Sequence, residues 1–223
     1  MDAKTIAEAF VSVRNKIDQA AVSARRSKQD VTLIAVSKQQ QPERIDASLA
    51  AGNRVFGENR VQEAKIRWEE RRAIYPDLRL HLIGPLQSNK TAEAVRLFDV
   101  IHTVDRPKIA TAIAVEATKQ RKQIECFIQV NTGDEPQKSG IAPAELSDFL
   151  EFCHMQEGLS VTGLMCIPPV EEEAAMHFAL LKTLANRHEL DSLSMGMSGD
   201  FEEAVGFGAT HVRVGSALFG ARS

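Results

Sequence analysis

The residue that is best placed to carry out chemistry is Lys38, which ends the short apolar run Val31-Thr-Leu-Ile-Ala-Val-Ser-Lys38. A β-branched apolar run of this length predicts a buried strand, and alternation along that strand puts Lys38 on the same face as Ile34 and Val36. Burial lowers the pKa of a lysine amine and makes its neutral form accessible, which suits condensation with an aldehyde. A lysine that only extends its amine from a strand end into solvent fits the same pattern.

Two glycine-rich loops near the end of the sequence could bind phosphate. They are Met195-Gly-Met-Ser-Gly-Asp200 and Val212-Arg-Val-Gly-Ser216. Hydroxyl and backbone N–H groups that could reach an anion belong to Ser198, Gly199, Gly215 and Ser216. Ordinary tight turns with helix caps would use the same residues. Combined with Lys38, the loops indicate a phosphorylated aldehyde as ligand, either pyridoxal phosphate or a sugar phosphate.

Arg213 and Asn59 could contact the ring of such a ligand. Arg213 alternates with two valines on the last predicted strand, so it faces the side opposite to theirs, and the pattern leaves open which side is the interior. A guanidinium only donates hydrogen bonds, so an inward Arg213 would keep a pyridine nitrogen unprotonated; an arginine paired with a carboxylate at the rim is the alternative. Asn59 could contact a ring hydroxyl or an imine, or cap the helix that follows it. His81 is interpreted as a hydrogen-bonded core histidine.

These residues are positioned by an alternation of strands and helices. The predicted strands are 31–38, 54–56, 78–83, 99–103, 124–131, 159–167, 192–194 and 211–214, and Gly57-Glu-Asn59 is predicted as a loop. Eight strands alternating with helices predict an α/β fold, a single parallel (β/α)8 TIM-type barrel over residues 1–223, with an open doubly wound sheet as the alternative. Closure would make the first strand neighbour the eighth and bring Lys38 beside the glycine-rich loops. An extra amphipathic helix over 1–26 is expected to pack on the barrel.

Composition narrows the class of protein. The 223 residues carry a formal net charge of −3, which excludes a strongly basic nucleic-acid surface. No apolar run reaches the ~20 residues that span a bilayer, and no metal-ligand spacing of Cys and His occurs. The three cysteines are widely spaced in apolar contexts, which indicates reduced core thiols. We therefore expect a cytoplasmic protein, with no membrane, nucleic-acid or metal partner, and a monomer.

Motifs spread over nearly the whole chain resemble those of the pyridoxal phosphate homeostasis protein family, also called the YggS-like or proline synthase co-transcribed family. The motifs are Ala35-Val-Ser-Lys38, Phe56-Gly-Glu-Asn59, His81-Leu-Ile-Gly-Pro-Leu-Gln-Ser-Asn-Lys90, Lys138-Ser-Gly140, Gly163-Leu-Met-Cys-Ile-Pro-Pro169, Ser194-Met-Gly-Met-Ser-Gly-Asp200 and Val212-Arg-Val-Gly-Ser-Ala-Leu-Phe-Gly220. Two positions depart from the pattern expected of many members, since Ser216 and Gln39 stand where threonine is common.

The resemblance implies a barrel similar to the alanine racemase N-terminal domain, with pyridoxal 5′-phosphate held as an internal aldimine. By matching motif, Lys38 would be the aldimine lysine and Arg213 the partner of the pyridine nitrogen. Ser198, Gly199, Gly215 and Ser216 would form the phosphate cup, and Asn59 would contact the ring edge. The implied function is vitamin B6 homeostasis, in which the protein buffers the cofactor or delivers it to apo-enzymes.

An enzyme remains the competing interpretation. A racemase needs a second acid/base opposite the imine, which in the racemases that this sequence resembles is a tyrosine from an additional β-domain and a partner subunit. The only tyrosine here, Tyr75, is predicted at a helix end away from the strand carboxyl ends. A Schiff-base aldolase would use Lys38 and the phosphate cup but leaves Arg213 unexplained. The sequence therefore favours a cofactor carrier without turnover over a racemase or an aldolase.

Overall fold

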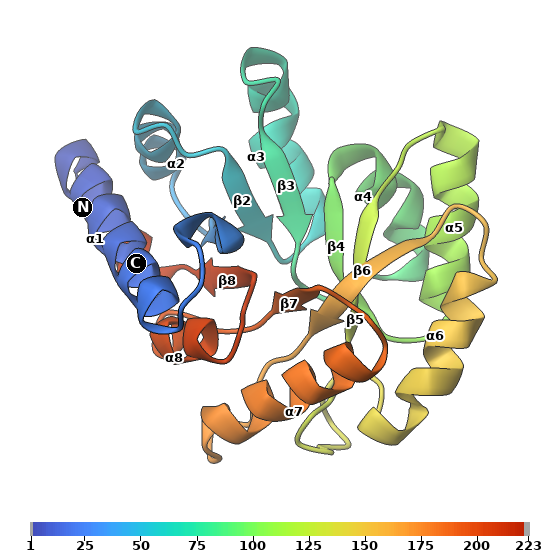
Figure 1. The fold of residues 1–223 in the computed structure, drawn as a ribbon. Coiled ribbons are helices and arrows are strands. Elements are labelled where there is room, and N and C mark those ends of the chain that lie inside the picture. Colours follow the sequence, from blue (N-terminus) through green and yellow to red (C-terminus); the bar gives the residue numbers. More distant parts are fainter. Residues whose placement is uncertain (1, 221–223) are drawn as a thin grey trace.

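The fold is a closed barrel of eight parallel strands surrounded by helices, in a computed structural model that describes residues 2–220 (Figure 1). The strands are β1 Thr32–Val36, β2 Val55–Glu58, β3 Arg79–Leu82, β4 Val100–Val104, β5 Glu125–Gln129, β6 Ser160–Met165, β7 Ser192–Ser194 and β8 His211–Val214. Each strand pairs with its sequence neighbours, and β1 also pairs with β8, with Ile34 opposite Arg213. The predicted (β/α)8 barrel is confirmed, and the open sheet is wrong.

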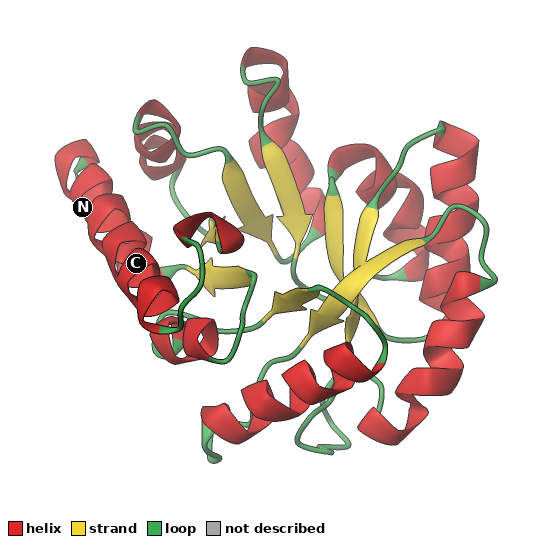
Figure 2. Cartoon of the chain, viewed as in Figure 1, coloured by secondary structure: helices red, strands yellow, loops and turns green. Residues whose placement is uncertain are grey.

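A helix follows every strand (Figure 2). The helices are α2 Pro42–Ala50, α3 Val61–Ile74, α4 Thr91–Leu97, α5 Pro107–Gln120, α6 Leu146–His154, α7 Ala174–Arg187, α8 Phe201–Gly206 and α9 Ser216–Phe219, with single 3₁₀ turns at Lys28–Asp30, Ser88–Lys90 and Pro143–Glu145. Of these, α9 spans only four residues. No helix within residues 2–220 combines the length and the apolar character needed to cross a bilayer.

The extra N-terminal helix is α1, Ala3–Ser23, and it completes the outer ring. Its apolar stripe, which includes Ile6, Phe10 and Ile17, is buried. The helix packs against α8, α2 and the short α9, where the ring of Phe10 meets the edge of Phe219 at 5.8 Å. Since α9 is too short to cover the barrel between α8 and α2, α1 occupies the place of the helix that would follow β8 (Figure 1).

The two faces of the strands have different chemistry. Outward side chains such as Phe56 pack under the helices, where its ring lies 4.5 Å from that of Trp68. Inward side chains fill the barrel, and Val100, Phe127 and Met165 form a separate apolar cluster there.

Strand boundaries differ from expectation at two functional positions. β1 ends at Val36, before Lys38, and β2 continues through Glu58, which was predicted in a loop.

Candidate functional site

One cavity at the carboxyl ends of the strands brings all seven predicted site residues together. It has a volume of about 310 Å³. Its lining includes Lys38, Asn59, Ser198, Gly199, Arg213, Gly215 and Ser216, together with Val36, Ile83, Ile167 and Met197. These residues come from the ends of β1, β2, β3, β6, β7 and β8. Barrel enzymes and binding proteins use this end of the strands for their ligands.

Lys38 lies in the turn that follows β1 and is half-buried. The alternation of β1 continues beyond its last residue, because Ser37 is directed to the outer face and Lys38 lines the cavity. The next residue, Gln39, has a left-handed backbone with φ of 60°. Such a conformation costs a residue with a side chain about 1–2 kcal/mol, so the chain is strained at the residue that directly follows Lys38.

A buried carboxylate fixes the ends of β1 and β2. Glu58 has no exposed surface and accepts hydrogen bonds from Ser37 Oγ at 2.6 Å, Trp68 Nε1 at 2.9 Å and Arg67 Nη1 at 2.8 Å. Burial raises the pKa of Glu58, and Arg67 and the hydrogen bonds oppose that shift. Ser37 and Glu58 directly precede Lys38 and Asn59, so their hydrogen bond sets the spacing of two cavity residues. The sequence analysis missed this role because it ended β2 before Glu58.

Arg213 is directed into the barrel and is only 4% exposed. Its Nη1 donates to Ser194 Oγ at 2.7 Å, and its Nη2 donates to the carbonyl oxygen of Cys166 at 2.9 Å. Among residues 2–220, no carboxylate lies within ion-pair distance of this guanidinium, so the alternative of a rim ion pair is wrong. Burial lowers the pKa of Arg213, but an arginine stays protonated in proteins. The cavity therefore contains a buried positive charge that has no ion-pair partner among residues 2–220, and Asp200 favours this charge only from beyond ion-pair distance.

The two glycine-rich loops meet at the same cavity. The backbone N–H of Gly215 donates to Ser198 Oγ at 3.2 Å, which ties the loop after β7 to the loop after β8. Asp200 closes its own loop by accepting from the Met197 N–H at 2.5 Å. A Cβ added to Gly199 would meet no atom within 4 Å, so open space lies beside this glycine. One oxygen of a bound anion could reach both Ser198 and the Gly215 N–H.

Asn59 offers a polar atom that has no partner. Its Oδ1 is buried and accepts no hydrogen bond from the described residues. A buried acceptor without a donor costs roughly 1–3 kcal/mol, so this atom indicates a ligand that donates to it. The expected helix cap is not formed, because the N-cap position of α3 is Arg60 and no side chain caps the helix.

A second cavity of about 340 Å³ adjoins the first and shares Asn59, Ile83 and Ile167 with it. It is bounded by the loop between β5 and α6, in which Lys138 pairs with Glu135 at 2.5 Å. Larger cavities of about 910 and 600 Å³ lie at the opposite end of the barrel, and none of the seven site residues lines them. Tyr75 is also at that end, where α3 leads into β3 and its ring lies under Arg54.

Other sequence predictions about buried residues are confirmed. His81 is buried in the core with its Nδ1 2.9 Å from His102 Nε2, and the three cysteines are buried and free of disulfides. Burial raises the pKa of the Cys166 thiol to about 12, which makes it a poor nucleophile. Within residues 2–220, no cluster of three or more metal-binding side chains is found.

The sequence matches the family described as the alanine racemase N-terminal domain over residues 13–223. The pyridoxal phosphate homeostasis protein of Escherichia coli K12 is 40% identical and covers 97% of both chains. Its counterpart in Pseudomonas aeruginosa PAO1 is 44% identical and covers 98% of this chain and 96% of its own.

Solved structures give the same relationship. PipY of Synechococcus elongatus PCC7942, solved with PLP bound, is 37% identical with a TM-score of 0.84, and the match covers 96% of this chain and 100% of PipY. Alanine racemase of Clostridium difficile shares the fold alone, at 13% identity and a TM-score of 0.76 over 99% of this chain and 58% of the racemase. The chain therefore belongs to the pyridoxal phosphate homeostasis protein family and has the barrel of the alanine racemase N-terminal domain.

Proposed function

We propose that the protein binds pyridoxal 5′-phosphate in the 310 Å³ cavity and serves intracellular vitamin B6 homeostasis by buffering or delivering the cofactor. Relatives that share about 40% of the sequence are named for this role, and PipY was solved with PLP bound. The observation that carries the proposal is that one cavity brings together Lys38, a buried Arg213 without an ion-pair partner, and two linked glycine-rich loops. An amine, a ring contact and an anion site are the three features that this cofactor requires.

Each residue of the cavity has a proposed role. When bound, pyridoxal phosphate would supply an aldehyde group that can condense with an amine with loss of water. Lys38 is the amine, and it lies at the end of β1 next to the strained Gln39. Asn59 Oδ1, which is buried without a donor, is suited to a ring hydroxyl or a protonated imine. Ser198, Gly199, Gly215 and Ser216 are the proposed phosphate contacts.

The position of Tyr75 favours a carrier over a racemase, and Arg213 would weaken the ring as an electron sink. Its guanidinium can donate but cannot accept, so it holds a ring nitrogen unprotonated, and an unprotonated ring withdraws electrons weakly. Turnover of the racemase kind also needs a second acid/base on the far side of the ring. Tyr75, the only tyrosine of the chain, lies at the opposite end of the barrel. We propose a monomeric, cytoplasmic carrier without its own turnover, which passes the cofactor to apo-enzymes.

The visible absorption spectrum of the protein incubated with PLP tests the proposal. The wild type should gain an absorption band that borohydride removes, and mass mapping of the reduced protein should place the adduct on Lys38. Lys38→Ala should lose this adduct, and Lys182→Ala, on the outer surface of α7, should keep it. A wild type that stays colourless would refute cofactor binding, and racemase or transaminase turnover that disappears in Lys38→Ala would refute the carrier role.

A further inference from the structure

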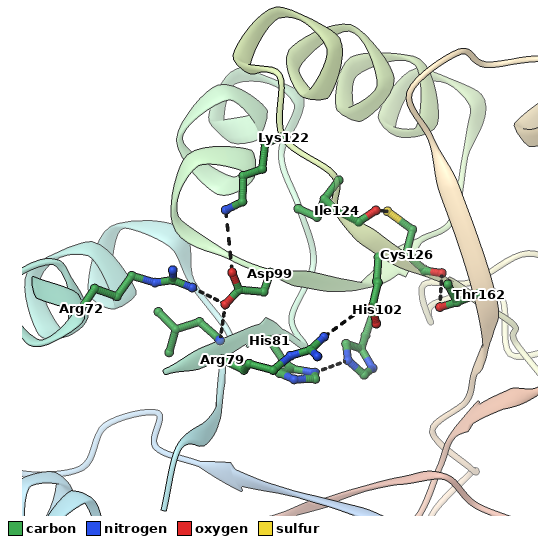
Figure 3. Close-up of polar contacts among 11 residues, drawn as sticks. Arg72, Arg79, His81, Asp99, His102, Lys122, Ile124, Cys126 and Thr162 are labelled. Carbon is green, nitrogen blue, oxygen red and sulfur yellow. Dashed lines mark hydrogen bonds and ion pairs between the residues drawn. The ribbon is translucent and has the colours of Figure 1, made fainter. Parts of the chain in front are cut away.

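The middle of the barrel interior is unusually polar. Barrels of this type fill that layer mainly with Val, Ile and Leu. Here His81 on β3, His102 on β4 and His211 on β8 lie within about 6 Å of one another, centre to centre. The rings of His102 and His211 also contact Phe127. Figure 3 shows the His81 and His102 rings facing each other between their two strands. Nothing in the proposed cofactor contacts uses these side chains, so they need a separate explanation.

A chain of buried hydrogen bonds connects this layer to Arg213. Arg213 Nη1 donates to Ser194 Oγ at 2.7 Å, Ser194 Oγ lies 2.8 Å from His102 Nδ1, and His102 Nε2 lies 2.9 Å from His81 Nδ1. All four residues are buried. His102 is also stacked on Phe127, with ring centres 4.4 Å apart and 7° between their planes. The chain therefore runs from the floor of the cavity to the centre of the barrel.

The number of protons on each residue indicates which atom donates in each hydrogen bond between Ser194, His102 and His81. Burial keeps the pKa of both His81 and His102 well below the ordinary value, so each imidazole is neutral and carries one N–H. If Ser194 donates to His102 Nδ1 and His102 Nε2–H donates to His81, only the Nε2–H of His81 lacks a partner. If instead His81 donates to His102 and His102 donates to Ser194, the hydroxyl proton of Ser194 lacks an acceptor in addition to His81 Nε2 lacking a partner. Within the hydrogen-bond chain from Arg213 to His81, His81 Nε2 is the one atom without a partner. Donation from Ser194 towards His81 therefore satisfies more of the donors and acceptors in this chain.

We propose that His102 is a positioning residue, which holds Arg213 through Ser194 so that its charge is directed at the ring of the cofactor. This inference rests on the proposed binding of PLP. A serine hydroxyl with its proton committed to His102 offers Arg213 a neutral acceptor in a fixed position. A carboxylate in its place would hold the guanidinium equally well but would neutralise its charge. The neutral hydrogen-bond chain through His102 thus orients Arg213 without neutralising its positive charge.

The cost of the chain supports a role beyond stability. A buried N–H without an acceptor, such as His81 Nε2–H, destabilises the folded protein. Apolar side chains of similar volume often replace a buried polar network with little loss of stability or with a gain. A core selected only for stability would therefore lack this row of imidazoles.

Two substitutions of His102 separate positioning from packing. His102→Phe keeps an aromatic ring to stack on Phe127 but removes the acceptor for Ser194, whereas His102→Asn places a carbonyl oxygen close to the Nδ1 position. We expect His102→Phe to weaken PLP binding about tenfold and to shift the absorption maximum of the bound cofactor. His102→Asn should restore most of both properties. The melting temperature without PLP should fall only modestly in His102→Phe, because Ser194 Oγ and His81 Nδ1 lose their partner while the stacking on Phe127 is kept.

Several outcomes would overturn the inference. Wild-type affinity and an unshifted spectrum in His102→Phe would show that Arg213 does not depend on the chain. A larger loss in His102→Asn than in His102→Phe would show that His102 acts through packing alone. Side-chain ¹⁵N shifts of the unloaded protein test the direction independently, because the proposal requires the proton of His102 on Nε2. If wild-type protein fails to bind PLP, the proposed function fails and this inference falls with it; normal wild-type binding with an unaffected His102→Phe refutes only the inference.

Discussion

Two buried charges lie close to the cavity, and their surroundings differ. Glu58, on the outer face of β2, is paired with Arg67 and accepts two further hydrogen bonds from Ser37 and Trp68. Arg213, on the inner face of β8, has a serine hydroxyl and a backbone carbonyl as its hydrogen-bond acceptors. A buried charge that is paired with an opposite charge depends on that pairing within the fold, whereas a buried charge without an ion-pair partner is available to a ligand. Within one barrel, Glu58 is therefore a buried charge that supports the fold, and Arg213 is a buried charge that is available for binding.

The contrast predicts that removing Glu58 affects the fold most. Glu58→Leu leaves the Ser37 hydroxyl, the Trp68 N–H and Arg67 without their acceptor, so the free energy of unfolding should fall by about 3–5 kcal/mol. Urea unfolding of the protein without cofactor measures this change. Glu125→Leu is the matched control, because its ion pair with Arg79 is about half exposed. A loss below 1 kcal/mol for Glu58→Leu would contradict the structural role.

The same contrast predicts the opposite behaviour for Arg213. Arg213→Leu should weaken PLP binding about a hundredfold, because the ring loses its charged donor. Stability without PLP should change by about 1 kcal/mol or less, since an apolar side chain replaces an uncompensated buried charge. Titration with PLP and urea unfolding of the same samples measure the two effects. Arg26→Leu is the control, because Arg26 also donates to two carbonyl oxygens, of Val205 and Ala209, but lies away from the cavity; it should lose stability and keep its PLP affinity.

The histidine layer predicts a loss of stability in acid. Burial, Arg79 and Arg213 lower the pKa of His211 from 6.5 to about 4. A lowered pKa in the folded state means that the unfolded chain binds the proton first, so stability falls as the pH decreases from about 6.5 towards 4. Because the ring is partly accessible, we expect His211 to account for roughly 2 kcal/mol of this fall. His211→Phe should flatten the profile of unfolding free energy between pH 7 and 4, and an unchanged slope would contradict the assignment.

Exposed ion pairs should have the smallest effects. Arg96 and Glu69 lie 2.8 Å apart across α4 and α3, but about half of each side chain is exposed. Glu69→Gln should change the free energy of unfolding by less than about 0.5 kcal/mol and leave PLP binding unchanged. The melting temperatures of the wild type and of Glu69→Gln, measured over a range of salt concentrations, would detect a larger contribution of this ion pair to stability. Such a contribution would contradict the distinction between the buried Glu58 and the exposed ion pairs.

Sequence reasoning could reach the barrel and the seven cavity residues because these depend on local patterns. Lys38 ends an apolar run, and the phosphate candidates lie in glycine-rich loops that must share one rim once β1 neighbours β8. The Ser37–Glu58 contact and the chain from Arg213 to His81 depend on which side chains meet across strands, and register is set by tertiary packing. One signal was available: His81, His102 and His211 each interrupt an apolar strand.

Strand boundaries were less predictable than strand identities. β1 was expected to reach Lys38 but ends at Val36, and β2 extends two residues into a predicted loop. Pairing decides both limits, because Val36 is the last residue of β1 that pairs with β2, and Gly57 and Glu58 pair with His81 and Leu82 of β3. The position of α1 was equally inaccessible, since its amphipathic pattern predicts burial but does not say which gap in the ring it fills.

Because α1 packs on α2, α8 and α9, its apolar face is fully covered only after the segment from α8 to α9 has been synthesised. The cavity has the same dependence, since Lys38 comes from β1 and the glycine-rich loops from β7 and β8. A partly synthesised or partly unfolded chain therefore lacks the complete site. A ligand in the cavity therefore binds only when the barrel is closed, and it stabilises the contact of β1 with β7 and β8, which are far apart in the sequence.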